Sequence, residues 1–520
     1  MYDFFSMKFT QRDIRNIFDK VKRQAIKACG KARYDRAIRY VECATMIAYQ
    51  TNEIYADDDL EELIGSLSRG LIVQSTGTPR PMPGKIVFYD SSGIDNVALT
   101  QQYLTAFATW NIELLYILNN PYSNARRAAY INDALRKNDK ATVFCVPSHL
   151  TRSEAVRAIH REIIAFVPEK ILLHLAPSDV VPLIVCNALS QCERYLINIT
   201  DHAFWLGRDS VDYYLEFRNF GITISTEKRK IDPKRLLLQY YYPIISCQPF
   251  RGLPPVPDDR AVRIFSGGAL YKIYGENERY FGLLRLLLNH YPEVVIYIAG
   301  SGNEAPIRRF IHRNGYENRL HLIGQRDDIV HVFRNIDIYL STYPIGGGLM
   351  TQLAAYCSVP VLAFADKNIS CKYIDELLPY GPQGDRPIVR GNIEEFCCYA
   401  ERLIGDKTFR KAEGEALHSR LLPPEAFSRS LHTHLFGQSK QPASFVHVPI
   451  DYEAITAIYM EVENRYMHNC VYELVSVFQG KMLWLFPKAT ASLIRIVLKK
   501  ETLLRIVSRI KKGYGLFRRN

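Results

Sequence analysis

Three consecutive glycines, Gly346, Gly347 and Gly348, separate the apolar segment IDIYLS from a segment of helical character. A turn without Cβ atoms lets a ligand approach the backbone closely, and the first N–H groups of a helix have no intrahelical partners. The run Ser341–Phe364 therefore predicts a site for a phosphate or diphosphate at a helix start. A tight turn that only lets a strand and a helix pack is the alternative.

Further donors and a cation accompany this turn. The N–H groups of Leu349, Met350 and Thr351 would complete the phosphate site, and the Thr351 hydroxyl would add a hydrogen bond. Lys272 follows the apolar segment VRIFSGG, and an ammonium on a flexible stem can reach a diphosphate there. Since a departing diphosphate gains negative charge, a cation held beside it favours the transition state. A solvated surface lysine is the alternative.

A candidate proton acceptor lies in the first half of the chain. In the segment NITDHAFWLGRDS, His202 follows an apolar run, where it could take a proton from an acceptor, and Asp201 could orient it. A structural or solvent-facing histidine is the alternative. The loop from residue 91 to 98 is a secondary candidate, although Gly93 and Asn96 suit a tight turn into a helix equally well.

All of these residues follow short apolar segments that alternate with helical ones. KIVFYD, IELLYIL, ATVFCVP and KILLHLA come first, RYLINIT and GITIST continue the pattern, and the alternation restarts at VRIFSGG. Such alternation predicts an α/β fold with two doubly wound parallel sheets, Rossmann-like, whose strand ends line a cleft between the domains. Helical patterns flank the sheets, as an N-terminal extension and a basic C-terminal tail.

These patterns set five expected divisions of the chain. They are a helical extension over 1–78, an acceptor domain over 79–240, a Tyr- and Pro-rich linker over 241–258, a donor domain over 259–440 and a helical region over 441–520.

Charge is distributed unevenly along the 520 residues. The formal net charge is +12, and Lys481–Asn520 holds eleven Lys and Arg against one Glu. A folded nucleic-acid groove is therefore not expected. Apolar and basic residues share Leu493–Ile510 in a pattern typical of a helix on an anionic membrane surface. A tail packed on the protein and a contact for a partner protein are the alternatives.

Composition and cysteine spacing indicate a compartment. The chain is 48% hydrophobic and 23% charged, as in ordinary globular proteins, and it contains no long apolar stretch or N-terminal leader pattern. Its eleven cysteines form no C-x-x-C pair, which predicts reduced, buried thiols, no structural zinc and a cytoplasmic location, with any membrane contact peripheral on the inner face.

Three motifs resemble the donor domain of GT-B glycosyltransferases. They are Arg263–Leu284, His321–Phe333 and the glycine run, and they are most similar to O-GlcNAc transferases and bacterial cytoplasmic N-glycosyltransferases. The resemblance implies that Lys272 binds the phosphates of a nucleotide-sugar, by analogy a UDP-sugar. It also implies that Gly324, Gln325 and Arg326 form the turn that reads the base. Arg326 could instead pair with a neighbouring carboxylate.

The chain departs from this resemblance at two positions. Retaining enzymes of the common GT-B type carry glutamates where this chain has Ile345 and Leu353, and no D-x-D motif stands in the donor half. We therefore expect inverting, metal-independent sugar transfer to an acceptor hydroxyl or amide of a glycan, a lipid-linked glycan or a protein. A non-catalytic partner or chaperone subunit of a transferase, and a nucleotide-sugar epimerase, are the alternatives.

Overall fold

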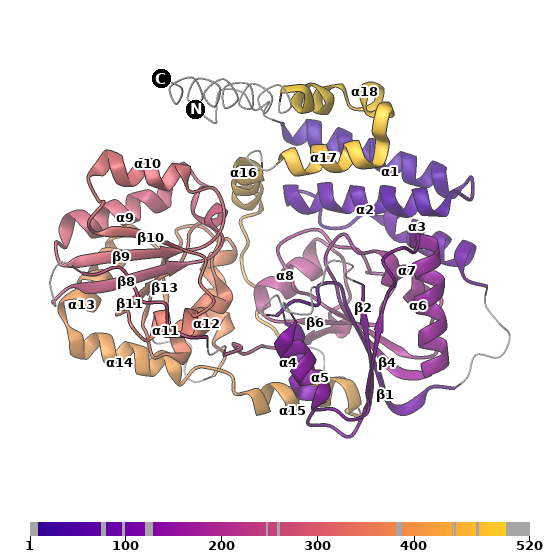
Figure 1. The fold of residues 1–520 in the computed structure, drawn as a ribbon, viewed down its shortest axis with the longest axis horizontal. Helices are drawn as coiled ribbons and strands as arrows, with labels where there is room; N and C mark the ends of the chain where they lie inside the picture. The colour runs from indigo at the N-terminus through magenta and orange to yellow at the C-terminus, as the bar shows by residue number, and fades with distance from the viewer. Residues whose placement is uncertain are drawn as a thin grey trace, which may run out of the picture.

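The computed structural model has two lobes, each built on a parallel sheet with helices packed around it (Figure 1). It describes residues 9–73, 80–95, 99–119, 128–245, 248–256, 260–380, 387–438, 440, 444–463 and 467–495. Asn96 and most of the basic segment Lys481–Asn520, including most of the expected helix at 493–510, lie outside the described residues.

The first sheet has seven parallel strands in the order β3-β2-β1-β4-β5-β6-β7. Its strands are β1 Met82–Asp90, β2 Glu113–Leu118, β3 Ala141–Cys145, β4 Pro168–His174, β5 Glu193–Ile197, β6 Tyr213–Glu216 and β7 Leu236–Leu238. The intervening helices are α4 Thr100–Phe107, α5 Ala129–Arg136, α6 Arg152–Phe166, α7 Val181–Asn187 and α8 Asn219–Glu227.

The second sheet has six parallel strands in the order β10-β9-β8-β11-β12-β13. Its strands are β8 Val262–Gly267, β9 Val294–Ala299, β10 Leu320–Gly324, β11 Ile338–Leu340, β12 Val361–Phe364 and β13 Val389–Arg390. Its helices are α9 Arg279–His290, α10 Ala305–Asn314, α11 Ile329–Phe333, α12 Gly348–Tyr356, α13 Ile393–Gly405 and α14 Lys407–His418, with the 3₁₀ segments η3 Leu270–Ile273 and η4 Ser370–Leu377. The predicted architecture of two parallel α/β sheets is confirmed.

Helices from both ends of the chain cover the first domain together. The N-terminal helices α1 Gln11–Cys29, α2 Tyr34–Thr51 and α3 Asp58–Leu71 lie beside α17 Met467–Phe478, which continues into η5 Gln479–Lys481 and α18 Met482–Leu485 (Figure 1). Amphipathic α1 begins at a capping box formed by Thr10 and Asp13 and turns Ile14, Phe18 and Val21 inward.

Two C-terminal helices run back across the lobes. Helix α15 Pro424–Phe436 packs on α4 of the first domain, where Phe427 contacts Tyr103 edge to face with ring centroids 5.2 Å apart. Helix α16 Tyr452–Glu463 lies between the two lobes and contacts α2 (Figure 1). The chain therefore ties the domains together after the second sheet is complete.

One apolar segment takes a different conformation from its neighbours in the sequence. The residues GITIST, Gly221–Thr226, belong to helix α8 rather than to a strand. This helix connects β6 to β7, which pair with each other in the sheet. β-Branched residues have only a slightly lower helix propensity, and burial of Ile222 and Ile224 outweighs it.

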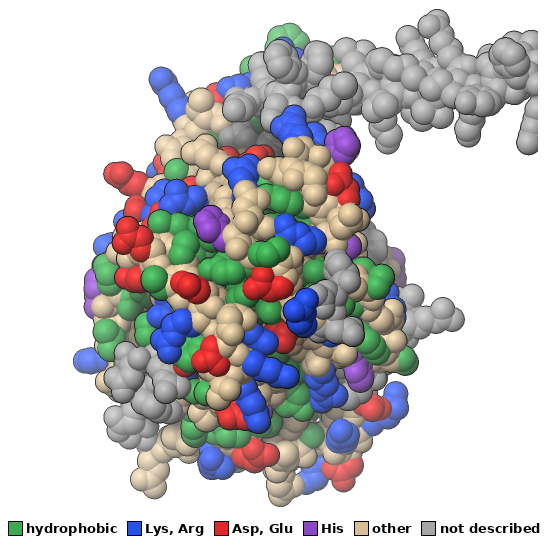
Figure 2. All heavy atoms as spheres, turned by 90° about the vertical axis from the view of Figure 1, so that its left-hand side faces the viewer, with side chains coloured by type: hydrophobic (Ala, Val, Ile, Leu, Met, Phe, Trp, Pro, Cys, Tyr) green, Lys and Arg blue, Asp and Glu red, His purple; other side chains and the backbone are tan. Residues whose placement is uncertain are grey.

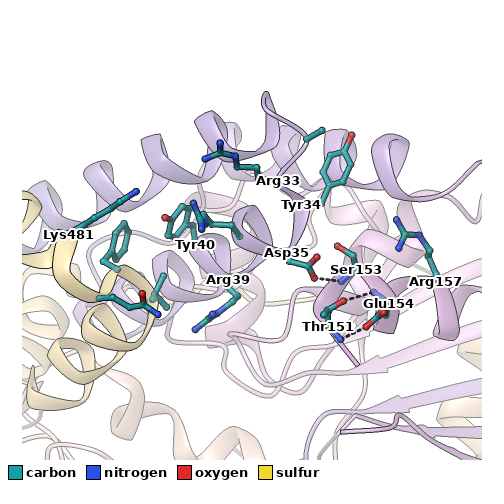
Figure 3. A pocket seen from close by; sticks show the side chains of 15 residues that line it. Arg33, Tyr34, Asp35, Arg39, Tyr40, Thr151, Ser153, Glu154, Arg157 and Lys481 are labelled. Atoms are coloured by element: carbon teal, nitrogen blue, oxygen red, sulfur yellow. Dashed lines mark hydrogen bonds between the residues drawn. The ribbon is translucent and has the colours of Figure 1, made fainter. Parts of the chain in front are cut away.

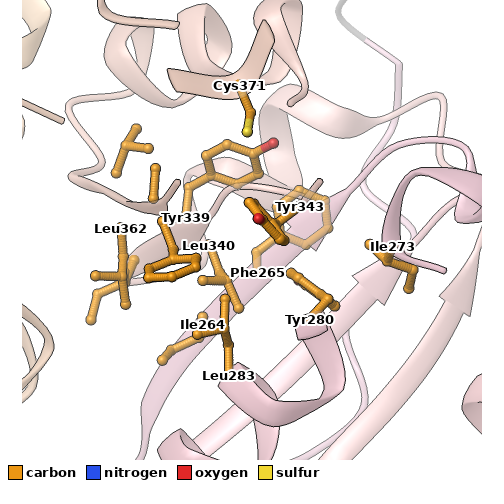
Figure 4. Packing of buried hydrophobic residues seen from close by; sticks show 14 of the residues in the cluster. Ile264, Phe265, Ile273, Tyr280, Leu283, Tyr339, Leu340, Tyr343, Leu362 and Cys371 are labelled. Carbon is orange, nitrogen blue, oxygen red and sulfur yellow. The ribbon is translucent and has the colours of Figure 1, made fainter. Parts of the chain in front are cut away.

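The core of the second domain supports the strand ends that carry the glycine turn. Phe265 of β8 and Tyr339 of β11 are fully buried side by side, with ring centroids 6.1 Å apart (Figure 4). Tyr280 of α9 donates a hydrogen bond of 2.6 Å to Ser266, one residue before the end of β8. This packing holds the carboxyl ends of β8 and β11 in register.

The surface over the second domain has no single sign of charge. Lys and Arg side chains alternate there with Asp and Glu (Figure 2). The expectation of buried thiols is wrong for part of the set, because Cys145 and Cys398 are exposed. Both lie on elements with a solvent face, where a small side chain is tolerated without burial.

Candidate functional site

The glycine turn and the Lys272 segment lie against each other at the ends of neighbouring strands. Strand β8 leads into η3, β11 leads into the glycine turn, and the Ile345 N–H donates to the Lys272 carbonyl over 3.4 Å. A Cβ added at Gly347 would lie 3.6 Å from the Gly267 carbonyl oxygen. The fold therefore brings together two segments that lie more than 70 residues apart in the sequence.

The start of α12 leaves backbone donors without helical partners. Its first hydrogen bond runs from the Thr351 N–H to the Gly347 carbonyl over 3.0 Å, so the N–H groups of Gly348, Leu349 and Met350 precede the hydrogen-bonded part of the helix. These three residues are half-exposed. Thr351 is buried, and its hydroxyl also donates to the Gly347 carbonyl, at 3.1 Å. Both donors of Thr351 are therefore used inside the helix.

Lys272 is half-buried on η3. Its ammonium makes no hydrogen bond or ion pair with any residue that the structure describes, and burial lowers the pKa of the side chain from its ordinary value of 10.5. A desolvated cation without a protein counter-charge costs free energy, which an anionic ligand would recover.

Close packing also requires glycine in this turn. A Cβ at Gly346 would lie 3.0 Å from Ile374 and 3.1 Å from Cys371, and a Cβ at Gly348 would lie 2.7 Å from Leu377. The glycines therefore allow close packing of the turn, which was the alternative interpretation, and the same turn also presents the N–H groups of Gly348, Leu349 and Met350.

The turn after β10 is held by an internal ion pair. Gly324 has a φ of +66°, and its carbonyl accepts from the Gly300 N–H at the end of β9. Arg326 donates to both carboxylate oxygens of Asp328, over 2.6 and 2.5 Å, and its side chain is 6% exposed. The Arg326 guanidinium holds the pKa of Asp328 well below its usual range.

The carboxylate-pairing alternative for Arg326 is thus the one seen in the structure. Gln325 is exposed, and its carbonyl accepts from Arg251. The turn lies two strands from β8, roughly 10 Å away across the sheet edge, and the carbonyls of Gly324 and Gln325 already accept hydrogen bonds from Gly300 and Arg251.

On the first domain, Asp201 anchors His202 and an interdomain contact. His202 Nδ1 lies 3.3 Å from Asp201, and Arg218 donates to the same carboxylate over 2.6 and 3.2 Å. Although burial alone would raise the pKa of Asp201, Arg218 and His202 hold it well below its usual range. Arg218 also donates to the carbonyl and hydroxyl of Ser370 on η4, at 3.0 and 2.8 Å. This buried ion pair joins the two domains beside Gly346.

Helix α16 brings the His202 loop near the Lys272 segment. The Tyr459 ring stacks on His202 with centroids 5.5 Å apart, and Val462 lies 3.2 Å from the position of a Cβ at Gly275. Residues three apart on a helix share a face. The histidine and the segment that follows Lys272 therefore flank one side of α16.

The structure adds residues that sequence reasoning missed: Arg218, Ser370 and Tyr459. Arg218 follows the short strand β6, so its position after a strand could have marked it. No local pattern marks Ser370 or Tyr459, because each depends on a contact between segments far apart in the chain.

The secondary loop after β1 fits a tight turn. Gly93 has a φ of +58°, and a Cβ there would lie 2.3 Å from Leu118. Beneath the loop, buried Asp90 contacts His174 Nδ1 at 3.1 Å, and His174 Nε2 accepts from the Leu99 N–H at 3.2 Å. These contacts tie the end of β1 and Leu99, just before α4, to His174 at the end of β4.

We compared the chain with known protein families, curated proteins and solved structures. No protein-family model matches the chain, and a search of curated proteins finds no match. Among solved structures, a mutant of S. aureus TarM in complex with fondaparinux, α-GlcNAc-glycerol and UDP superposes with a TM-score of 0.50 at 9% identity, over 68% of this chain and 100% of that one. The chain has a GT-B fold.

Two further solved structures match the chain with TM-scores below 0.5. A Thermobaculum terrenum O-GlcNAc transferase mutant has a TM-score of 0.48 at 15% identity, over 87% of this chain and 82% of that one. Anabaena HepE in complex with UDP and glucose has a TM-score of 0.49 at 13% identity, over 67% and 98%.

Two further features concern the described residues alone. None of their helices has both the length and the apolar character needed to cross a membrane. Within the same residues, no three His, Cys, Asp or Glu side chains are grouped as metal ligands.

Proposed function

We propose that the chain is a glycosyltransferase that moves a sugar from a nucleotide-diphosphate donor, a UDP-sugar by analogy, to an acceptor hydroxyl or amide. The second domain binds the donor and the first presents a glycan, lipid-linked or protein acceptor. Transfer proceeds with inversion and without a metal ion.

The observation that carries this proposal is the environment of the Lys272 ammonium. It is desolvated, lacks a carboxylate partner among the described residues, and belongs to the segment that hydrogen-bonds to the glycine turn. A diphosphate between Lys272 and the N–H groups of Gly348, Leu349 and Met350 would satisfy the cation and the backbone donors together.

The proposed transfer step is a displacement at the anomeric carbon of the donor sugar. The acceptor oxygen or nitrogen forms a bond to the anomeric carbon from the side opposite the diphosphate. The bond from that carbon to the phosphate oxygen breaks, and its electron pair leaves with the nucleoside diphosphate. Lys272 and the N–H groups stabilise the charge that develops there, which is the part a metal ion plays elsewhere.

His202 receives the proton that the acceptor loses. With Nδ1–H directed at the ionised Asp201 carboxylate, Nε2 is left as the basic nitrogen. Arg218 keeps Asp201 ionised and in place, so it acts as a positioning residue. Ile345 and Leu353 are buried apolar side chains and offer no carboxylate to the donor.

We also propose that the basic segment Lys481–Asn520 docks on an anionic membrane surface from the cytoplasmic side. Supporting this, Leu483 is 59% exposed and Trp484 is 88% exposed, two and three residues after Lys481. Exposed Trp and Leu beside basic residues suit the headgroup region. Flotation with vesicles containing phosphatidylglycerol tests this, and undiminished flotation of protein ending before Lys481 would contradict it.

The main test measures donor binding and turnover. Isothermal titration calorimetry with UDP should show binding that weakens at least tenfold in Lys272→Ala and stays unchanged in Lys411→Ala, an exposed lysine on α14. A panel of UDP-sugars should then identify the donor that releases UDP. Binding of UDP without turnover of any nucleotide-sugar or acceptor would favour the non-catalytic partner, and equal UDP binding in both variants would overturn the site.

A further inference from the structure

A second basic hollow lies on the helical layer, and it shares no lining residue with the candidate donor site. It has a volume of about 960 Å³ and is bounded by the start of α2, the start of α6, and the end of α17 with η5. Figure 3 shows Lys481 and Arg157 at opposite ends of the hollow, with Arg33 and Arg39 between them.

Its charge is mostly positive and mostly unpaired. Five cationic side chains line it, and all are exposed: Arg33, Arg36, Arg39, Arg157 and Lys481. None of them forms an ion pair with a described residue. Arg39 donates only to the carbonyl and hydroxyl of Ser476, at 3.3 and 3.5 Å.

The two carboxylates in the lining are occupied by backbone groups. Asp35 accepts the Ser153 N–H over 2.8 Å, and Glu154 accepts the Thr151 N–H over 2.8 Å at the start of α6 (Figure 3). They cap the start of α6, and their two negative charges offset only two of the five cations. The hollow therefore keeps an excess of three positive charges that face solvent.

The spacing of the arginines concentrates this charge. Arg36 and Arg39 lie three residues apart on α2 and so share a face of the helix, and Arg33 directly precedes its first residue. A guanidinium presents two parallel N–H donors that match phosphate oxygens, so several on one face suit an anion with more than one phosphate.

Aromatic rings form the base of the hollow. Tyr40 and Phe478 are buried and stacked, with centroids 4.7 Å apart and planes at 11°. This pair joins α2 to α17, so the base of the hollow is rigid while the charged side chains around it are free to move to a ligand.

We propose that this hollow binds a ligand with two or more linked phosphate groups and that the bound ligand clamps α17 and η5 against α2 and α6. The shared chemistry is a set of linked phosphates, which either a soluble polyphosphate compound or a phospholipid with two phosphates in its headgroup can supply. The proposal is independent of the donor site.

The experiment uses the full chain with Lys272→Ala, so that the donor site does not contribute. Tripolyphosphate is titrated into this protein by calorimetry and compared between R36Q/R157Q and a control pair, R309Q/R313Q, whose arginines are exposed on α10. We expect binding to weaken at least tenfold in R36Q/R157Q only. Because all four arginines are exposed, each variant should keep the parent's thermal unfolding profile.

A second arm separates the sources of phosphate. Vesicles containing cardiolipin, whose headgroup joins two phosphates through a glycerol, replace tripolyphosphate, with the same variant pairs. Loss of vesicle binding in R36Q/R157Q alone, with no tripolyphosphate binding by the parent, assigns the hollow to lipid headgroups. Equal effects of both variant pairs on both probes, or no binding of either probe, would overturn the proposal.

Discussion

Both sheets are parallel and carry polar side chains near their carboxyl ends, but these side chains differ in whether they have hydrogen-bond or ion-pair partners. At the first sheet, buried Asp90 accepts from Thr100 and Tyr116, each over 2.8 Å, and contacts His174 at 3.1 Å. At the second sheet, the Lys272 ammonium has no partner among the described residues. Polar groups that satisfy one another hold loops in place, whereas a desolvated cation left unpaired indicates a place for a ligand.

The Asp201–Arg218 pair lies at the boundary between these two kinds of edge. It belongs to the first sheet but reaches Ser370 in the second domain. Replacing a member of this pair therefore provides the strongest test of whether the polar groups at the carboxyl end of the first sheet stabilise the fold.

Breaking this pair should have the largest effect. Arg218→Ala would leave Asp201 charged and buried, and we expect a loss of about 3–5 kcal/mol in the free energy of unfolding. Urea unfolding measures it. Arg136→Ala, which removes an exposed ion pair with Asp133, should cost at most about 1 kcal/mol. Similar losses in the two variants would mean that the boundary pair does not support the fold.

Removing the charge of Lys272 should act on turnover instead. Lys272→Met keeps the length of the side chain, and we expect kcat to fall by about 10²–10³ with the unfolding midpoint nearly unchanged. The UDP-release assay with the identified donor measures kcat, and Lys411→Met is the control. An unchanged kcat would contradict the view that Lys272, at the end of the second sheet, acts on a ligand while the polar groups of the first sheet stabilise the fold.

Glu216, at the end of β6, allows a pH test of the hydrogen-bonded polar groups at the carboxyl end of the first sheet. Burial raises its pKa from 4.5 to about 7, despite hydrogen bonds from Ser225 and Asn198. Because the folded state then binds more protons, stability should fall as pH rises from about 4.5 through 7. The full effect is about 3 kcal/mol.

Unfolding measured from pH 5 to 8 should show this slope in the wild type and a flatter one in Glu216→Gln. Parallel curves for the two proteins would show that Glu216 does not titrate as its burial implies.

The smallest effect concerns the packing of the glycine turn. A Cβ at Gly348 would approach Leu377 to 2.7 Å and the Tyr241 hydroxyl to 2.9 Å, so Gly348→Ala should destabilise the fold by about 1–3 kcal/mol. Gly405→Ala, with no atom within 4 Å, is the matched control. If Gly348→Ala binds UDP more weakly but is as stable as the wild type, glycine is needed at this position only to let the ligand approach the backbone.

The fold was largely predictable because its signals are local. Apolar segments such as KIVFYD and VVIYIAG alternate with amphipathic helical segments, and segment length together with periodicity distinguishes the two. Prediction failed at GITIST, where β-branched residues form α8, because burial of Ile222 and Ile224 outweighs a small propensity difference.

The candidate site was predictable only in part. Lys272 and the glycine turn follow strands and could be located from the sequence, and their role as a diphosphate site stays a prediction. The pairing of Arg326 with Asp328 was one of two open interpretations until the structure placed the two side chains together.

The sequence by itself determined the two parallel sheets, the glycine turn at a helix start and the uneven distribution of basic residues, since each depends on residue types a few positions apart. Only the tertiary structure decided that Arg218 joins Asp201 to Ser370, that Tyr459 covers His202, and that Lys272 lacks a described partner. Those facts depend on which distant segments meet, and residue spacing along a chain does not encode the distance between side chains across a domain boundary.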